Sequence, residues 1–162
     1  MSPRNYTVQT KINKPVRIVF DAIVQADHMC KYFVDKTSGP LVEGKVITWN
    51  WGQWGDYPVT VTRLVPHKLI ELEANSTAWK KTTGAGYSVK MLFELEPLSD
   101  TSTLLTISEA GWLHDEPGYK ASHENCGGWT HMALCLKAYL EYGLDLRGLS
   151  PEIPNPATPV VS

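Results

Sequence analysis

The hydrophobic positions of the chain change their period twice along the sequence. Over residues 6–12 apolar and polar side chains alternate, which is typical of a strand with one buried face. Pro15 then precedes apolar residues at helical spacing over residues 16–23. A second short helix is expected to follow as far as about Phe33, with Asp27 as its cap. The pattern therefore predicts a strand followed by two small helices.

From Gly39 onward the period falls from near four to two. Strands are predicted at about residues 41–51, 57–65, 69–75, 87–96 and 103–110. Most of the intervening segments are short and rich in Gly, Pro, Asp and Ser, so neighbouring strands should pair as an antiparallel meander. The clearest alternation places Val89, Met91, Phe93 and Leu95 on one face, so one side of the sheet should be covered.

A long amphipathic helix is predicted over residues 124–143, after a loop at residues 112–121. Its apolar side chains recur at steps of three and four: Trp129, Met132, Ala133, Leu136 and Leu140. Gly127 and Gly128 each cost about 1 kcal/mol relative to alanine inside a helix, so we expect a close approach to the backbone there. We interpret this helix as a lid over the sheet that closes a cavity, with Trp129 and Met132 nearest to the ligand.

Four short segments, in this order, carry a resemblance to a known family. They are residues 14–22 (KPVRIVFDA), 30–33 (CKYF), 39–44 (GPLVEG) and the Gly128-Trp129 pair. Residues 6–143 resemble the family of activator of heat-shock ATPase homologues, within the START-related, pollen-allergen-like (SRPBCC) superfamily. The resemblance implies an α+β helix-grip fold: a curved antiparallel sheet of about six strands, two small helices and a long C-terminal helix over a cavity. It implies no shared catalytic residues, and such a fold does not define a function.

One helix-grip domain is expected over residues 1–146, followed by a proline-rich tail over residues 147–162. The length of 162 residues and the hydrophobic content of 43% are ordinary for one globular domain. The formal net charge of -2 and the lack of a basic run argue against a nucleic-acid or anionic-membrane partner. No signal peptide and no membrane span is expected, because the apolar runs are too short. We therefore expect a cytoplasmic protein.

The aromatic residues are concentrated in one part of the chain. The chain has six tryptophans and seven tyrosines, and they concentrate between Trp49 and Tyr87 rather than spreading evenly. The predicted ligand-binding set contains Trp49, Trp51, Trp54, Tyr57, Trp79, Tyr87 and Trp112, with Met91 and Phe93 from the sheet and Trp129 and Met132 from the long helix. Stiff apolar rings with one polar edge suit a planar or apolar ligand. We predict that at least three of the aromatic set line a cavity; the alternative is that they only fill the core.

Glu109 and Asn125 are the polar candidates in the ligand-binding set. Glu109 shares strand parity with Leu105 and Ile107, so an inward orientation would place a carboxylate with a raised pKa at the cavity edge. The alternative, which we favour from the sequence, is an exposed strand end paired with a lysine. Asn125 either faces the apolar space and needs a partner there, or caps the start of the long helix.

Metal and nucleophile chemistry have little support in the sequence. His114, Asp115, His123, Glu124 and His131 gather near the long helix, but none of their spacings matches a known ligand pattern. His28 is expected to be solvated. Cys30, Cys126 and Cys135 are interpreted as reduced, buried thiols. No nucleophile motif and no phosphate-binding glycine loop is present, so we expect no metal and no cofactor.

Three functions follow from these observations. The leading hypothesis is a module that binds or senses a small apolar or aromatic molecule. The alternative is an enzyme of the cyclase, dehydratase or hydrolase type, using Glu109, Asn125 or a histidine. The third is an interaction protein that activates a chaperone ATPase. A homodimer formed through strand edges or the tryptophan-rich turn is compatible with the sequence, which does not decide it.

Overall fold

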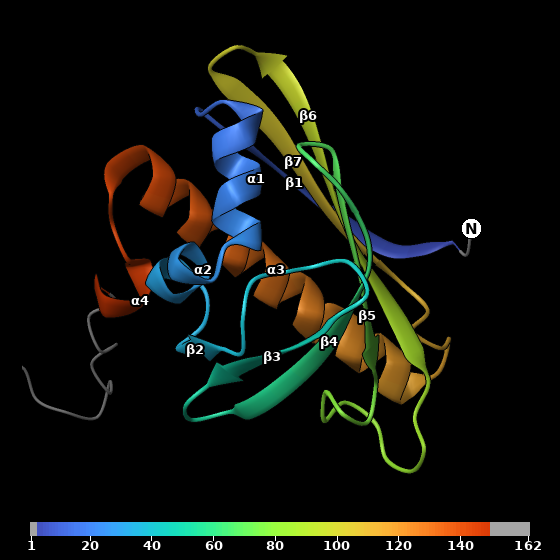
Figure 1. Cartoon of the computed structure of the whole chain (residues 1–162). Coiled ribbons are helices and arrows are strands. Elements are labelled where there is room, and N and C mark those ends of the chain that lie inside the picture. The colour runs from blue at the N-terminus through green and yellow to red at the C-terminus, as the bar shows by residue number, and fades with distance from the viewer. Residues whose placement is uncertain (1–2, 150–162) are drawn as a thin grey trace, which may run out of the picture.

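The computed structural model describes residues 3–149. A seven-stranded antiparallel sheet, in the order β1-β7-β6-β5-β4-β3-β2, packs against the long helix α3. The elements in chain order are β1 (Arg4–Ile12), α1 (Val16–Val24), α2 (Ala26–Tyr32), β2 (Lys36–Thr37), β3 (Val46–Trp51), β4 (Gly55–Val65), β5 (Leu69–Asn75), β6 (Ser88–Ser99), β7 (Ser102–Ala110), α3 (Glu116–Tyr142) and α4 (Leu146–Leu149). Figure 1 shows α3 crossing one side of the sheet, with α1, α2 and α4 grouped near its C-terminal end. The predicted α+β helix-grip fold is confirmed.

The sheet follows the predicted meander closely. The strands from β3 to β7 pair with their neighbours in sequence, and β1 returns to pair with β7. The strand β5 covers the predicted residues 69–75, whereas the strand predicted from residue 41 begins at Val46. Thr37 and Lys36 add the short edge strand β2, which the hydrophobic pattern did not reveal because it has only two residues.

The core lies between α3 and the face of the sheet that the alternating pattern predicted. Met91, Phe93 and Ile107 from β6 and β7 are buried, and they belong to the same cluster as Trp129 and Leu136 of α3. The opposite face carries ion pairs, such as Arg4 Nη2 to Glu94 Oε2 at 2.9 Å. Burial on one face therefore fixes the register of the strands and the position of α3.

The start of α3 lies further upstream than the hydrophobic pattern predicted. Asp115 is the N-cap, and its Oδ1 accepts a hydrogen bond of 2.8 Å from the Gly118 backbone N–H. Pro117 lies in the first turn, where a missing N–H costs nothing. The predicted loop over residues 112–121 is therefore wrong beyond Asp115, because these start signals outweigh the weak apolar pattern of the first turns. Gly143, with φ of 65°, ends the helix where predicted.

Two smaller predictions about helices are wrong. Asp27 lies inside the first turn of α2, whose N-cap is Gln25 and has no side-chain capping bond. Among the described residues, nothing lies within 4 Å of a Cβ built on Gly127 or Gly128, so no close approach explains them. The tight glycine is Gly118, where an added Cβ would lie 2.0 Å from the Leu113 carbonyl oxygen.

The C-terminal region is described only as far as α4. Residues 150–162 of the predicted tail lie outside the described residues. Residues 146–149 form α4, which spans the predicted domain boundary. Within residues 3–149, no helix combines the length and the apolar character needed to cross a membrane.

Candidate functional site

A cavity of about 610 Å³ opens between the middle of α3 and the β3–β4 hairpin. Helix α2, the segment after it, the β5–β6 connection and α4 complete its walls. Its lining consists of Tyr32, Phe33, Asp35, Trp51, Gln53, Trp54, Trp79, Asn125, Gly128, Trp129, His131, Met132, Cys135 and Arg147. The volume lies within the range of sites that hold small organic ligands. The α3 residues of the lining recur at helical spacing, so one face of this helix forms one wall.

Aromatic rings dominate the walls and hold one another in place. Phe33 makes ring contacts with Trp51 and Trp129, at centroid distances of 5.1 and 5.7 Å. Trp79 lies 6.4 Å from Trp129 and completes the apolar surface. Edge and tilted contacts at these distances are favourable for aromatic pairs. The walls are therefore stiff, and they present ring surface to the space between them.

The indole N–H groups of three wall tryptophans are already bonded within the protein. Trp51 Nε1 donates to the Phe33 carbonyl oxygen at 2.6 Å, and Trp79 Nε1 donates to the Pro58 carbonyl oxygen at 2.8 Å. Trp129 Nε1 donates to Glu109 Oε2 at 3.3 Å. Each bond fixes the orientation of one ring, and it also removes one donor from the cavity.

The turn at the rim holds a tryptophan that the protein itself leaves uncovered. Trp54 is 62% exposed, although it lines the cavity. Its carbonyl oxygen accepts a hydrogen bond from Lys80 Nζ at 2.5 Å, and the same ammonium lies 4.3 Å from the centre of the Tyr57 ring. Lys80 therefore ties the β3–β4 turn to the β5–β6 connection, while the Trp54 side chain remains open to a ligand.

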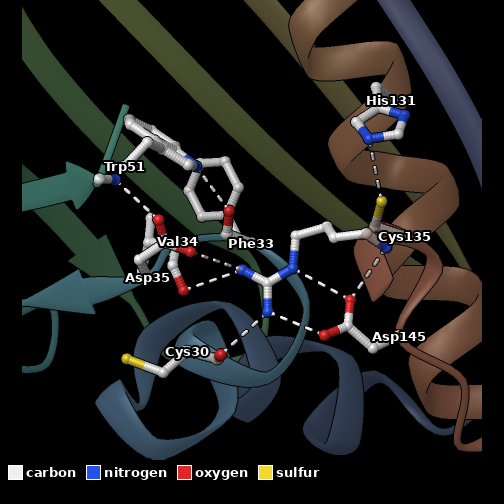
Figure 2. Close-up of polar contacts among 10 residues, drawn as sticks. Cys30, Phe33, Val34, Asp35, Trp51, His131, Cys135 and Asp145 are labelled. Carbon is white, nitrogen blue, oxygen red and sulfur yellow. Dashed lines mark hydrogen bonds and ion pairs between the residues drawn. The ribbon is translucent and has the colours of Figure 1, made fainter. Parts of the chain in front are cut away.

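Arg147 closes the side of the cavity next to α2, by contacts that Figure 2 draws as dashed lines. Its guanidinium donates to the carbonyl oxygens of Val34 at 2.9 Å and Cys30 at 3.0 Å, at the C-terminal end of α2. Two further bonds go to the Asp145 carboxylate, at 3.0 and 3.1 Å. Asp35 Oδ1 lies 3.9 Å away on the other side. A cation at a helix C-terminus is favourable, so Arg147 fastens α4 to α2.

A thiol and an imidazole from neighbouring turns of α3 also line the cavity. Cys135 Sγ and His131 Nε2 are 3.4 Å apart (Figure 2). Burial raises the pKa of the Cys135 thiol, which keeps it protonated near neutral pH. Cys30 and Cys126 are free thiols but only partly buried, so the prediction of buried thiols holds for Cys135 alone.

Glu109 and four hydrogen-bond donors around it form a second polar cluster, which we call the Glu109 hub. The carboxylate is 1% exposed. Tyr6 Oη and Trp112 Nε1 donate to Oε1, the latter at 3.0 Å, and Asn125 Nδ2 and Trp129 Nε1 donate to Oε2 at 3.1 and 3.3 Å. An ionised carboxylate accepts about four hydrogen bonds, so its capacity is filled. The predicted exposed, lysine-paired position is therefore wrong.

The environment of Glu109 shifts its protonation in two opposing ways. Burial raises the pKa of the Glu109 carboxyl, and the hydrogen bonds from the four donors lower it; the net shift is upward. Burial also raises the pKa of Tyr6, with the neighbouring carboxylate adding to the effect. Glu109 does not line the 610 Å³ cavity. Acid–base chemistry by this carboxylate on a molecule in that cavity has no geometric support.

Asn125 and Trp129 belong both to the cavity lining and to the Glu109 hub. Each lines the cavity, and each donates to Glu109 Oε2. The prediction that Asn125 caps the helix start is wrong, because α3 begins at Glu116. Its partner is a side chain of the sheet, one of the alternatives that the sequence left open.

The structure brings together part of the predicted ligand-binding set. The residues that line the cavity are Trp51, Trp54, Trp79, Asn125, Trp129 and Met132. Trp49, Met91 and Phe93 are buried in the core beneath these rings, and Tyr57 packs against Trp51 and Trp79 from outside. Tyr87 and Trp112 form a separate cluster with Val89, away from the cavity. Strand parity alone could not separate these layers.

Sequence reasoning did not include several lining residues in the ligand-binding set. They are Tyr32, Phe33, Asp35, Gln53, His131, Cys135 and Arg147, whereas Gly128 lies where the sequence predicted a close approach to the helix. Phe33 is the last residue of the predicted second small helix, so its aromatic side chain was a usable signal. Arg147 had no signal, because its partners Cys30 and Val34 lie far away in the sequence.

The histidines near α3 do not gather into a metal site. Within residues 3–149, no group of three or more His, Cys, Asp or Glu side chains is arranged to hold a metal ion. His28, expected to be solvated, is only partly exposed, and its Nδ1 lies 2.6 Å from Tyr139 Oη. This contact joins α2 to α3 behind the cavity.

Comparisons with known proteins agree with this architecture. The family model described as Activator of Hsp90 ATPase homolog 1-like protein matches residues 13–141. A search of curated proteins finds no match to the chain.

Solved structures of similar fold come from several bacteria. The protein SSP2350 from Staphylococcus saprophyticus superposes with a TM-score of 0.67 at 24% identity, covering 88% of this chain and 96% of that one. The Aha1 dimer from Colwellia psychrerythraea gives 0.67 at 22% identity, covering 85% and 96%. CalU16 from Micromonospora echinospora gives 0.65 at 15% identity, covering 88% and 78%. At these identities the likeness supports the fold alone.

Proposed function

This chain belongs to the Activator of Hsp90 ATPase homolog 1-like family, and we propose that it binds a small apolar or aromatic molecule in the cavity between α3 and the β3–β4 hairpin. The observation that carries the proposal is the 610 Å³ cavity whose lining includes six Trp, Phe and Tyr side chains. Ring surface of this kind favours planar ligands through apolar burial and stacking. Glu109, the carboxylate on which the enzyme hypothesis relied, does not line this space, which favours binding or sensing over catalysis.

The geometry disfavours the enzyme hypothesis and gives no support to chaperone activation. The enzyme hypothesis needed a titratable group converging on the cavity, but Glu109 is enclosed behind Asn125 and Trp129. Asp35 is half exposed at the rim, and its Oδ2 accepts the Gly52 backbone N–H at 2.7 Å. For chaperone activation, no observation beyond the family match favours a particular surface. A cytoplasmic location and a homodimer stay predictions from the sequence.

Two adjacent glycines of α3 offer a matched test of the site. Gly128 lines the cavity and Gly127 does not, and a Cβ on either meets open space within the described residues. Gly128→Leu should place apolar atoms in the cavity, and Gly127→Leu should leave it free. Both variants should fold, since each replaces glycine inside a helix by a better helix former.

Binding can be measured by quenching of intrinsic tryptophan fluorescence with a series of naphthalene derivatives. The wild type and Gly127→Leu should give saturable quenching with similar affinity. Gly128→Leu should weaken the affinity by about tenfold or more, the effect of losing roughly 1.4 kcal/mol of contact. Absence of saturable binding to the wild type, or equal affinity in both variants, would overturn the proposal.

A further inference from the structure

Most hydrogen-bond donors around the cavity are already used by the protein. The indole N–H groups of Trp51, Trp79 and Trp129 donate to protein oxygens. The Tyr32 hydroxyl, at the α2 side, donates to the Ala22 carbonyl oxygen at 2.9 Å. A ligand therefore meets the faces of these rings rather than their polar edges.

The guanidinium of Arg147, which lines the cavity, also makes its hydrogen bonds within the protein. Arg147 makes four side-chain hydrogen bonds to Val34, Cys30 and Asp145. Its positive charge lies between the carboxylates of Asp145 and Asp35, at 3.0 and 3.9 Å. Two negative charges beside one positive charge leave this side of the cavity unfavourable for an anionic ligand.

Asn125 provides the opposite kind of group, an acceptor that the protein leaves open. Its side-chain amide is 8% exposed, and Nδ2 donates to Glu109 Oε2. Oε2 also accepts a hydrogen bond from the Trp129 indole N–H, so the end of the amide that faces it is the NH₂ group and the other end is the carbonyl. Within residues 3–149 the carbonyl oxygen Oδ1 accepts no hydrogen bond, and it is not among the fully enclosed atoms without a partner. Asn125 lines the cavity, so a ligand there can approach this side chain.

We propose that the cavity selects an uncharged aromatic ligand carrying a hydroxyl or N–H group, which donates a hydrogen bond to Asn125 Oδ1. Glu109 acts as a positioning residue, because its carboxylate holds the amide with Oδ1 free. The inference rests on the proposed function and adds the ligand class. It follows from an imbalance in the inner wall: the buried indole, phenol and guanidinium donors there bond to protein oxygens, and one nearly buried acceptor has no donor. A buried polar group gains most from a partner where water is excluded.

Three ligands with the same rings test this selectivity on the wild-type protein. They are 2-naphthol, which carries a donor, 2-methoxynaphthalene, which lacks it, and 2-naphthoate, which is anionic. Affinities from equilibrium dialysis should rank in that order. The naphthol should bind about tenfold more tightly than the ether, the factor expected for one hydrogen bond in an enclosed site.

Two leucine variants then locate the acceptor. Asn125→Leu should reduce the naphthol-to-ether affinity ratio to about one. Gln53→Leu removes an amide from the exposed rim of the same cavity and should keep the ratio. A ratio lost in Gln53→Leu and kept in Asn125→Leu would overturn the assignment. If Asn125→Leu fails to fold, the side-chain amide NMR signal of Asn125 in the wild type replaces it: this signal should shift further with naphthol than with the ether.

The outcomes separate this inference from the proposed function. If none of the three ligands binds, both are overturned. If the naphthol and the ether bind equally, the cavity binds aromatic molecules but Asn125 does not select among them. If the naphthoate binds most tightly, the cavity favours anions and the inference is wrong, although the ligand site stands.

Discussion

The Glu109 hub and the cavity lie on either side of Asn125 and Trp129. They differ in how far their polar groups are hydrogen-bonded within the protein. In the hub, four donors fill the acceptor capacity of one buried carboxylate. In the cavity, the indole N–H groups of Trp51, Trp79 and Trp129 bond to protein oxygens, while ring faces and the Asn125 carbonyl oxygen remain without a hydrogen-bond partner among the described residues. The difference shows how one helix can serve two purposes: the closed side stabilises the fold and orients the two shared side chains, and the open side leaves them for a ligand.

The largest effect should come from breaking the hub. Glu109→Gln replaces one acceptor oxygen by an NH₂ group that faces existing donors, so two donors lose their partner. We expect a fall of about 2–4 kcal/mol in the free energy of unfolding, measured by urea denaturation. Glu124→Gln is the matched control, because Glu124 is exposed and pairs with Lys81; it should change stability by at most about 0.5 kcal/mol. Equal effects in both variants would contradict the role of the hub.

A smaller loss of stability is expected on the cavity side when α4 is detached. Arg147→Met removes the bonds to the carbonyl oxygens of Cys30 and Val34 but keeps an apolar stem. Because the guanidinium is partly exposed, we expect a cost of about 1–2 kcal/mol. Arg17→Met, on the exposed side of α1, is the control and should be within about 0.5 kcal/mol of the wild type. A thermal melt of both variants checks this difference.

Two tryptophans should separate stability from binding. Trp112→Phe removes the donor to Glu109 and should cost about 1 kcal/mol or more, with unchanged affinity for naphthalene ligands. Trp54→Ala removes an exposed ring at the rim, so stability should change by about 0.5 kcal/mol or less while affinity falls about threefold to tenfold. The comparison fails if Trp112→Phe weakens binding as much as Trp54→Ala.

The smallest effect concerns pH. Because burial raises the folded-state pKa of Glu109, the stability that this carboxyl contributes is complete below the ordinary pKa of a glutamate. It is lost as the pH rises through the raised value. The difference in unfolding free energy between the wild type and Glu109→Gln should therefore narrow as the pH rises from the ordinary glutamate pKa to the raised one. The other carboxyl groups titrate alike in both proteins, so they do not contribute to this difference. A difference that widens instead would show that the hydrogen bonds to Glu109 lower its pKa by more than burial raises it.

Much of the fold could be predicted because it depends on short-range periodicity. The alternating face at Val89, Met91 and Phe93 gave the buried side of β6, and turn residues separated most strands. The start of α3 was missed because the hydrophobic pattern is weak there, although Asp115 and Pro117 are ordinary start signals. The two-residue strand β2 is too short to have a period.

The site was less predictable, since it depends on which layer each side chain occupies. The segment around Trp51 and Trp54 was found from its aromatic content. Trp49 has the same parity as Trp51 yet lies beneath the cavity rather than in its lining. The strand parity of Glu109 left an inward position open, but the exposed position that we favoured is wrong. Its donors come from β1, from α3 and from the segment after β7. No local pattern in the sequence brings these elements together.

The central claim is that a ligand enters the cavity and leaves the closed side of the hub undisturbed. It is tested most directly by the indole N–H signals of the six tryptophans in a ¹H–¹⁵N NMR titration with 2-naphthol. The account predicts saturable shifts for Trp51, Trp54, Trp79 and Trp129, with little change for Trp112 on the far side of Glu109. Absence of saturation, or a shift of Trp112 as large as those of the cavity tryptophans, would contradict it.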